Sequence, residues 1–158
     1  MSLYLVRHGS AGDRYRWSGD DLERPLDDRG RVEAQALAAQ LADRGITRLV
    51  SSRAVRCQQT IGPLAHRLGI DIEIAPALLE GTLGGEAAAL ARSLVAQEAV
   101  LCSHGDVIPA LVRALTLDGM RLVGARGCEK GSVWELTVSG GELVSGTYLG
   151  VPPPNPAD

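Results

Sequence analysis

Apolar and polar residues follow one another along the chain in blocks that predict strands and helices in turn. Four short apolar runs have the length and composition of buried strands, at residues 3–7, 48–52, 71–75 and 99–103. Four longer segments carry apolar residues at helical spacing, at about 27–44, 54–68, 86–96 and 106–117. Because each strand is followed by a helix, the pattern predicts an α/β fold: an open, mostly parallel sheet with helices on both faces.

The first two predicted helices have recognisable ends. Asp27 or Asp28 can cap the start of the first helix, and Gly45 ends it. Gly69 ends the second helix, and Pro63 is expected to kink or restart it. Apolar side chains at helical spacing should face inward from these two helices: Val32, Leu37, Leu41, Ile61, Leu64 and Leu68.

The last part of the chain predicts a β-hairpin followed by a tail. Two strand-like segments, 132–138 and 142–149, flank a Gly-Gly pair that is typical of a hairpin turn. We expect the Pro-rich residues 151–158 to form a disordered tail. With 158 residues and no internal repeat, the chain is long enough for one core and short for two. We therefore expect a single domain over residues 1–150.

Composition and charge narrow the classes of function. Hydrophobic residues make up 45% of the chain, which favours a packed globule over disorder. The formal net charge of −3 gives no reason to expect a nucleic acid or a membrane surface as partner. The three cysteines lack CxxC spacing, and the N-terminal MSLYLVRHG lacks the pattern of a signal peptide. We therefore expect free thiols and a cytoplasmic protein, while the oligomeric state stays open.

Side chains that can do chemistry follow four of the predicted strands. His8 and His104 come directly after apolar strands, and each precedes a glycine that lets the backbone turn sharply and a ligand approach. Arg7 precedes His8, Arg56 follows the second strand, and Glu80 follows the third. Because ligands of such sheets bind outside the carboxyl ends of the strands, we expect these five side chains to gather at one edge.

That set suits phosphoryl transfer, which depends mainly on positioning and on stabilising spread negative charge. Arg7 and Arg56 can clamp phosphoryl oxygens with paired N–H donors. Neutral His8 is a competent nucleophile, and the neighbouring arginines disfavour its protonated form. Glu80 can protonate the leaving oxygen and later activate water. Each residue alone has an ordinary structural explanation, as His66 does within its helix, but their joint placement favours an active site.

These motifs resemble those of the histidine phosphatase superfamily, also called the phosphoglycerate mutase-like family. The RHG hallmark stands at 7–9, and the second histidine stands in S-H-G at 103–105. The family's S-S-x-x-x-R-x-x-Q-T segment is SSRAVRCQQT at 51–60, with Arg53 where the family often has proline. The acid after strand three matches Glu80. The resemblance covers nearly the whole chain and implies a phosphoglycerate mutase-like three-layer sandwich.

The resemblance also implies a role for each residue of the set. His8 accepts the phosphoryl group as a phosphohistidine, and Glu80 protonates the leaving group, with Glu86 as the competing acid. No metal or other cofactor is implied. The implied phosphate- and substrate-binding residues are Arg7, Gly9, Ser10, Arg56, His104 and Gly105.

The substrate stays open between a phosphohistidine protein and a nucleotide or other small phosphoester. The short segment between Glu80 and His104 leaves little room for a large lid, and this is similar to the small SixA-like branch of phosphohistidine phosphatases. A nearer likeness is to the histidine phosphatase domain that follows a MutT-type Nudix domain in some actinobacterial nucleotide hydrolases. The shared segments are RYRWSGDDLERPLDDRG, RCQQT, LLEG, CSHGDVIP and KGSVWEL. These 158 residues contain no Nudix part, so a separate Nudix partner stays open.

Two further features have two interpretations each. The basic and aromatic residues Arg14, Arg16 and Trp17 could cover a base or ribose, or they could belong to a solvated loop held by its own acid–arginine pairs. Lys130, the only lysine of the chain, could reach a distal phosphate, or it could protect the edge of the predicted hairpin.

Two other classes of function remain as alternatives. One is a metal-dependent hydrolase that uses His8, His104 and Asp106, although the further His or carboxylate cluster of such sites is missing from the sequence. The other is a phosphate-binding module without turnover. A dinucleotide-binding module and a serine hydrolase are weaker alternatives, because GxGxxG and GxSxG are absent.

Overall fold

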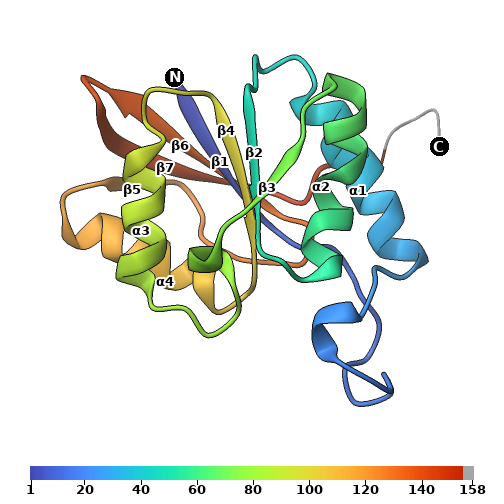
Figure 1. Ribbon diagram of the computed structural model, residues 1–158. Helices are drawn as coiled ribbons and strands as arrows, with labels where there is room; N and C mark the ends of the chain where they lie inside the picture. Colours follow the sequence, from blue (N-terminus) through green and yellow to red (C-terminus); the bar gives the residue numbers. More distant parts are fainter. Residues whose placement is uncertain (155–158) are drawn as a thin grey trace.

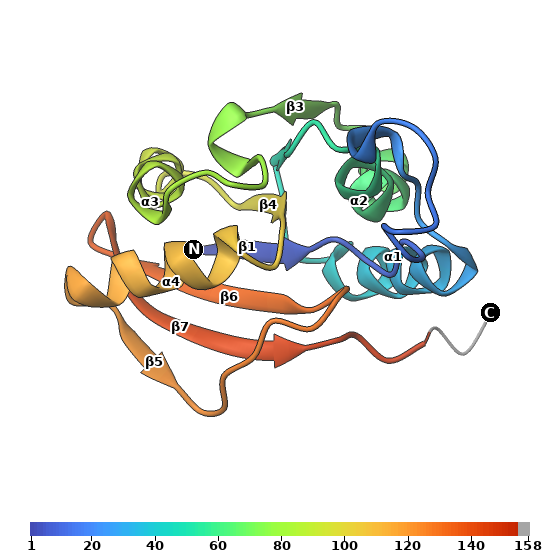
Figure 2. The same ribbon diagram turned by 90° about the horizontal axis from the view of Figure 1, so that it is seen from below.

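The computed structural model describes residues 1–154 and shows seven strands in one mixed sheet (Figure 1). The strands are β1 (Ser2–Arg7), β2 (Arg48–Ser51), β3 (Ile72–Ile74), β4 (Ala99–Ser103), β5 (Arg121–Val123), β6 (Val133–Ser139) and β7 (Glu142–Gly150). Their order is β3-β2-β4-β1-β6-β7-β5, with β3 and β5 at opposite edges (Figure 2). Only β6 runs against its neighbours among the described strands. The predicted open, mostly parallel sheet is therefore confirmed.

Four α-helices and two short 3₁₀ helices complete the fold. They are η1 (Asp21–Glu23), α1 (Asp28–Leu41), α2 (Val55–Leu68), η2 (Pro76–Leu78), α3 (Gly84–Ser93) and α4 (Val107–Leu117). Helices α1 and α2 cover one face of the sheet, and α3 and α4 cover the other (Figure 1). Successive residues of a strand point to opposite faces, so Tyr4 and Val6 pack under α1 and α2, whereas Leu3 and Leu5 pack under α3 and α4.

Helix α1 corrects one of the predicted inward positions. The helix ends at Leu41 rather than near residue 44, and Gly45 follows with φ +70°. Val32 is 46% exposed, so the prediction that it faces inward is wrong. Five residues at about 100° each place it on the far side from Leu37, which is buried.

Helix α2 runs unbroken through Pro63, so the predicted restart does not occur. Ile61 and Leu64 are fully buried on the two sides of the proline. Burial of each such side chain contributes about 1.5–3 kcal/mol, which together outweighs the roughly 3 kcal/mol cost of an interior proline. Gly69 ends the helix in the left-handed conformation, as predicted.

The C-terminal part contains the predicted hairpin and one strand that the sequence pattern missed. Strands β6 and β7 pair antiparallel around Gly140 and Gly141, both of which have positive φ. Strand β5 pairs with β7 at the sheet edge, and its first and last residues are exposed. It therefore lacks a run of buried apolar residues from which it could be predicted. Residues 151–154 continue alongside α1 (Figures 1 and 2), and Pro152 is buried. Residues 155–158 of the predicted disordered tail lie outside the described residues.

A helix that crosses a membrane must be long and predominantly apolar. None of the helices within residues 1–154 is long and apolar enough to do so.

Candidate active site

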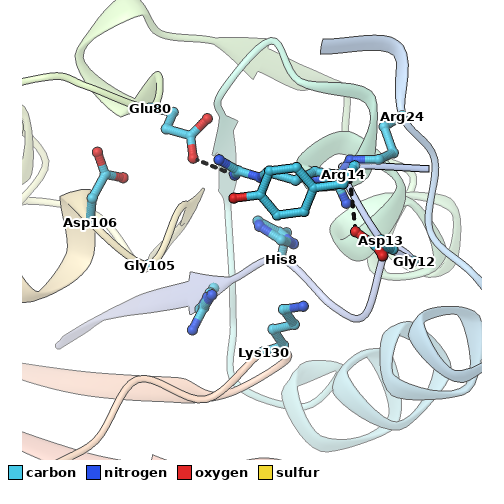
Figure 3. A pocket seen from close by; sticks show the side chains of 11 residues that line it. His8, Gly12, Asp13, Arg14, Arg24, Glu80, Gly105, Asp106 and Lys130 are labelled. Carbon is cyan, nitrogen blue, oxygen red and sulfur yellow. Dashed lines mark hydrogen bonds and ion pairs between the residues drawn. The ribbon is translucent and has the colours of Figure 1, made fainter. Parts of the chain in front are cut away.

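A pocket of about 450 Å³ lies at the carboxyl ends of β1 and β4 (Figure 3). Its walls come from the end of β1, the loop 10–27, the segment after η2, the start of α4 and the turn before β6. The lining residues are Arg7, His8, Gly12, Asp13, Arg14, Tyr15, Arg24, Glu80, Gly105, Asp106 and Lys130. The strand ends thus bring together segments that are far apart in the sequence.

His8 stands at the end of β1 with a fixed ring orientation. It is 6% exposed, and its backbone N–H donates to the Ser103 carbonyl at 3.0 Å. The Nδ1 atom lies 2.8 Å from the carbonyl oxygen of Gly9. Because a carbonyl oxygen only accepts, Nδ1 carries the ring proton and Nε2 keeps its lone pair. Gly9 is held in turn by Thr60, whose hydroxyl accepts from the Gly9 N–H at 2.9 Å.

The surroundings of His8 keep its imidazole neutral. Burial lowers its pKa most, and the nearby positive charge of Arg56 and Arg7 lowers it further, together with His104. The hydrogen bond to Gly9 acts in the opposite direction. The resulting pKa is about 3, so the imidazole is neutral at neutral pH, with its Nε2 lone pair free to act as a nucleophile.

Arg7 lines the pocket beside the turn that begins α4. Its Nη1 donates to the Cys128 carbonyl at 2.7 Å. A Cβ atom on Gly105 would lie 2.6 Å from Arg7 Cζ, so glycine at this position lets the guanidinium pack against the backbone. Among the described residues, the buried Nε of Arg7 has no hydrogen-bond partner.

Arg56 lies fully buried at the back of the site, on the first turn of α2. Its Nη1 donates to the Asp21 carbonyl at 2.7 Å, and its Nη2 lies 3.1 Å from Asp21 Oδ2 and 3.6 Å from Glu80 Oε2. Asp21 also pairs with Arg24 at 2.9 Å. The loop 10–27 therefore fixes the guanidinium, while the buried Nε has no partner within the part of the chain described.

His104 follows β4 and lies beside His8, with ring centroids 5.4 Å apart. Its Nε2 is 2.8 Å from Ser52 Oγ and 3.6 Å from Cys57 Sγ. Ser52 Oγ also accepts from Ala54 N–H, and no other acceptor for its hydroxyl proton lies in the described residues. We therefore assign that proton to the bond with Nε2, which leaves Nδ1 as an unpaired, buried N–H donor.

The structure separates the two acids that competed for the proton-donor role. Glu80 lines the pocket and pairs with Arg14 at 3.0 Å (Figure 3). Glu86 is exposed in the first turn of α3 and does not line the pocket. Asp106 does line it, and its Oδ2 accepts from the Gly81 N–H at 2.8 Å. Geometry thus favours Glu80 over Glu86 and adds Asp106 as a neighbouring acid.

The structure divides the basic and aromatic residues of the loop 10–27. Arg14 lines the pocket, but Arg16 and Trp17 border a neighbouring hollow with Pro25 and Leu26. The Trp17 Nε1 donates to the Asp20 carbonyl at 3.0 Å. The loop is held by the Asp21–Arg24 pair, as its solvated-loop interpretation expects, although Arg24 itself is buried.

Ser10 is also turned away from the pocket. Its hydroxyl donates to Asp27 Oδ2 at 2.6 Å, and its backbone N–H donates to Glu33 Oε1 at 2.8 Å. These bonds connect the loop after β1 to the start of α1, so Ser10 supports the site from behind.

Sequence reasoning did not single out three residues that shape the site, Tyr15, Ser52 and Thr60, and it considered Asp106 only as a metal ligand. Tyr15, 91% exposed, and Asp106 line the pocket, while Ser52 and Thr60 hold His104 and Gly9 from behind. Ser52 and Thr60 lie within the SSRAVRCQQT segment, so that motif contained their signal. Tyr15 and Asp106 lie in the RYRWSGDDLERPLDDRG and CSHGDVIP segments quoted for the resemblance, but neither segment indicated that these two side chains line the pocket. Within residues 1–154, no three His, Cys, Asp or Glu side chains are grouped so that they could hold a metal ion.

Comparison with known proteins identifies relatives of this chain. Residues 3–90 match the histidine phosphatase superfamily (branch 1). The chain is 41% identical over 156 residues to an 8-oxo-(d)GTP phosphatase of Mycolicibacterium smegmatis. That alignment covers 96% of this chain and 48% of the relative, so this chain spans about half the length of the curated protein.

Two solved structures share the fold. The protein histidine phosphatase SixA, complexed with tungstate, has a TM-score of 0.76 at 22% identity, and the match covers 96% of this chain and 97% of that one. A mycobacterial glucosyl-3-phosphoglycerate phosphatase has a TM-score of 0.73 at 20% identity, covering 96% and 98%. The family match spans more than half of the chain and includes the strand-end residues from Arg7 to Glu80. The sequence relative and the two structures of the same fold are phosphatases by name. This chain belongs to the histidine phosphatase superfamily.

Proposed function

We propose that the protein is a phosphohydrolase that works through a covalent phosphohistidine on His8. The observation that carries this proposal is the state of that ring. His8 is buried and neutral, and its Nδ1 is engaged by the Gly9 carbonyl, so that only Nε2 is free to attack phosphorus.

Buried donors around His8 support the same proposal. Four buried side-chain nitrogen or oxygen atoms lack a partner among the described residues, and three of them belong to Arg7, Arg56 and His104. Buried polar groups are normally hydrogen-bonded. A phosphoryl group beside His8 has oxygens to accept such bonds, and donors already in position stabilise the charge of the transition state.

The reaction then proceeds in two displacements. In the first, Nε2 of His8 forms a bond to phosphorus while the bond from phosphorus to the leaving oxygen breaks, and Glu80 supplies a proton to that oxygen. In the second, water attacks phosphorus, Glu80 takes a proton from it, and the bond to Nε2 breaks to regenerate neutral His8. Arg7, Arg56 and His104 bind the phosphoryl oxygens in both steps.

The substrate class follows from the size of the site and from the sequence relative. A pocket of about 450 Å³ is within the range of small-molecule sites, roughly 300–1,000 Å³. The relative from Mycolicibacterium smegmatis acts on 8-oxo-(d)GTP by its name. We therefore propose a small phosphorylated molecule as substrate, with a nucleotide as the leading candidate and a phosphohistidine protein as the second.

Turnover by histidine variants tests the proposal. His8→Ala should abolish hydrolysis of p-nitrophenyl phosphate and of nucleotide substrates, because no covalent intermediate can form. The matched control is His66→Ala, since His66 is an exposed histidine of α2 outside the pocket and should keep full activity. Substantial turnover by a folded His8→Ala protein would refute the phosphohistidine mechanism.

The two alternative functions give different results in the same assay. A metal-dependent hydrolase would lose activity on p-nitrophenyl phosphate after dialysis against EDTA and regain it with zinc or manganese. The proposed enzyme should keep its activity, because arginine side chains supply the positive charge at the site. A phosphate-binding module would bind phosphate esters without hydrolysing them.

A further inference from the structure

Lys130 lies in the turn before β6, at the carboxyl edge of the sheet, and not along the edge of the hairpin. It is the only lysine of the chain, and it lines the pocket. The backbone of this turn is bonded to the end of β1. The Gly131 N–H donates to the carbonyls of Arg7 and His8 at 3.1 and 3.0 Å, and the Arg7 N–H donates to the Ser132 carbonyl at 3.1 Å. The backbone at Lys130 is therefore held beside the end of β1, close to His8.

Within residues 1–154, Lys130 differs from the other cations of the pocket in having no partner. Arg14 pairs with Glu80, Arg24 pairs with Asp21, and Arg7 donates to the Cys128 carbonyl. No hydrogen bond or ion pair involves the Lys130 ammonium group among the residues described. Figure 3 shows Lys130 on the opposite side of His8 from the Arg14–Glu80 pair.

Glu80 and Lys130 both line the pocket into which a leaving group would extend from a phosphoryl group on His8. In the proposed mechanism, Glu80 protonates the oxygen that joins the leaving group to phosphorus. The oxygens of the transferred phosphoryl group are bound by Arg7, Arg56 and His104. We infer that Lys130 binds a second anionic group, a phosphate or a carboxylate, which stays on the leaving group. This inference rests on the proposed function and specifies its substrate as a small molecule with two anionic groups.

Matched substrate pairs test this role through the ratio of kcat/KM values. 3-Phosphoglycerate carries a carboxylate that glycerol 3-phosphate lacks, and a nucleoside diphosphate carries a phosphate that the monophosphate lacks. The wild-type protein should prefer the member with two anionic groups in at least one pair. The pair that shows this preference identifies the second anionic group as a carboxylate or a phosphate. Lys130→Gln should lower that preference by roughly 10- to 100-fold, the range expected for a hydrogen bond to a charged group.

Two further variants separate charge from structure in this assay. Lys130→Arg keeps the positive charge and should restore most of the preference. Arg126 lies with Lys130 in the segment between β5 and β6, but it is exposed outside the pocket. Arg126→Gln therefore removes a positive charge from this segment and should leave the preference unchanged. The inference is overturned if the wild-type protein shows no preference, or if Lys130→Gln lowers kcat/KM equally for both members of the pair.

A binding measurement separates this inference from the proposed mechanism. Trace acetylation of the amines is followed by mass spectrometry of the peptides, with the Met1 amine as internal reference and orthophosphate or pyrophosphate as the probe. Pyrophosphate should slow acetylation of Lys130 more than orthophosphate does at equal occupancy, both in the wild type and in His8→Ala. Equal protection by the two anions, or none, contradicts the role of Lys130, whereas turnover by His8→Ala contradicts only the proposed mechanism.

Discussion

The floor of the pocket and the loop 10–27 above it are built in opposite ways. By the floor we mean His8, which lines the pocket, together with Arg56 and His104, which are buried beside it and do not line the pocket. These three residues are 6%, 0% and 1% exposed, and each is fixed by backbone or hydroxyl hydrogen bonds. On the loop, Tyr15 and Arg16 are almost fully exposed. This contrast indicates that the two regions have different tasks. A buried, prearranged floor suits binding of the phosphoryl group, whereas an exposed loop suits contacts that differ between substrates.

One part of the loop belongs to the floor. Asp21 joins the buried guanidinium groups of Arg56 and Arg24. Its pKa is lowered, because the hydrogen bond from Arg24 and the charge of Arg56 outweigh the effect of burial, which raises it. The stretch around η1 therefore positions the floor, whereas the stretch 12–15 lines the pocket.

The largest effect among single changes of the floor, after loss of His8, is expected from His104. His104→Gln removes the unpaired Nδ1 donor, and loss of one such donor lowers kcat by roughly 10²–10³. Labelled phosphohistidine should still form, but more slowly. Rapid-quench kinetics measures the rate of labelling, and an unchanged rate in a correctly folded variant would exclude His104 from binding the phosphoryl group.

The next largest effect separates the two candidate acids. Glu80→Gln should lower kcat/KM by about 10²-fold for substrates with poor leaving groups, in the range of general acid catalysis. It should have little effect on p-nitrophenyl phosphate, whose leaving oxygen hardly needs a proton. Glu86→Gln is the matched control and should leave kcat/KM unchanged for both types of substrate. Equal losses for both substrate types in Glu80→Gln would point to Asp106 or solvent as the proton donor.

The low pKa of His8 predicts how stability depends on pH. Its folded value of about 3 lies below the unfolded value near 6.5, so between these limits the unfolded chain binds a proton that the native protein does not. His8 alone therefore lowers the free energy of unfolding by about 1.4 kcal/mol for each pH unit below 6.5. Urea unfolding from pH 7 to pH 5 should show a steeper loss for the wild type than for His8→Gln. Parallel pH profiles would contradict a buried, neutral His8.

The smallest effects are expected on the loop. Arg14→Ala should raise KM a few-fold, because an exposed charge contact from Arg14 to the substrate would contribute only about 0.2–1 kcal/mol. Arg16→Ala and Trp17→Ala should leave KM and kcat unchanged, since both side chains border the neighbouring hollow. Steady-state kinetics on a nucleotide substrate measures these differences. A larger rise in KM for Trp17→Ala than for Arg14→Ala would show that the loop rearranges when substrate binds.

The same contrast explains what could be predicted from the sequence. The strand ends were predictable, because an apolar run followed by Arg-His-Gly or Ser-His-Gly fixes both the strand and the place of its polar residues. The loop was not, because nothing in Arg14, Arg16 and Trp17 says which of them faces the pocket. The geometry depends on Arg24 being buried under the loop, a contact with no periodicity in the sequence. The predictions for Val32 and Pro63 failed for a related reason: tertiary packing outweighed the local sequence pattern. Val32 is apolar but exposed, and α2 continues through Pro63.

The most direct measurement is the chemical identity of the phosphorylated residue during turnover. A substrate carrying labelled phosphate is mixed with the wild-type protein and quenched in base, and the modified peptide is analysed by mass spectrometry and phosphorus NMR. The hydrogen bond from Nδ1 to Gly9 predicts acid-labile, base-stable label on Nε2 of His8, and no label in His8→Ala. Label on Nδ1 of His8, on His104, or on the His8→Ala protein would contradict it.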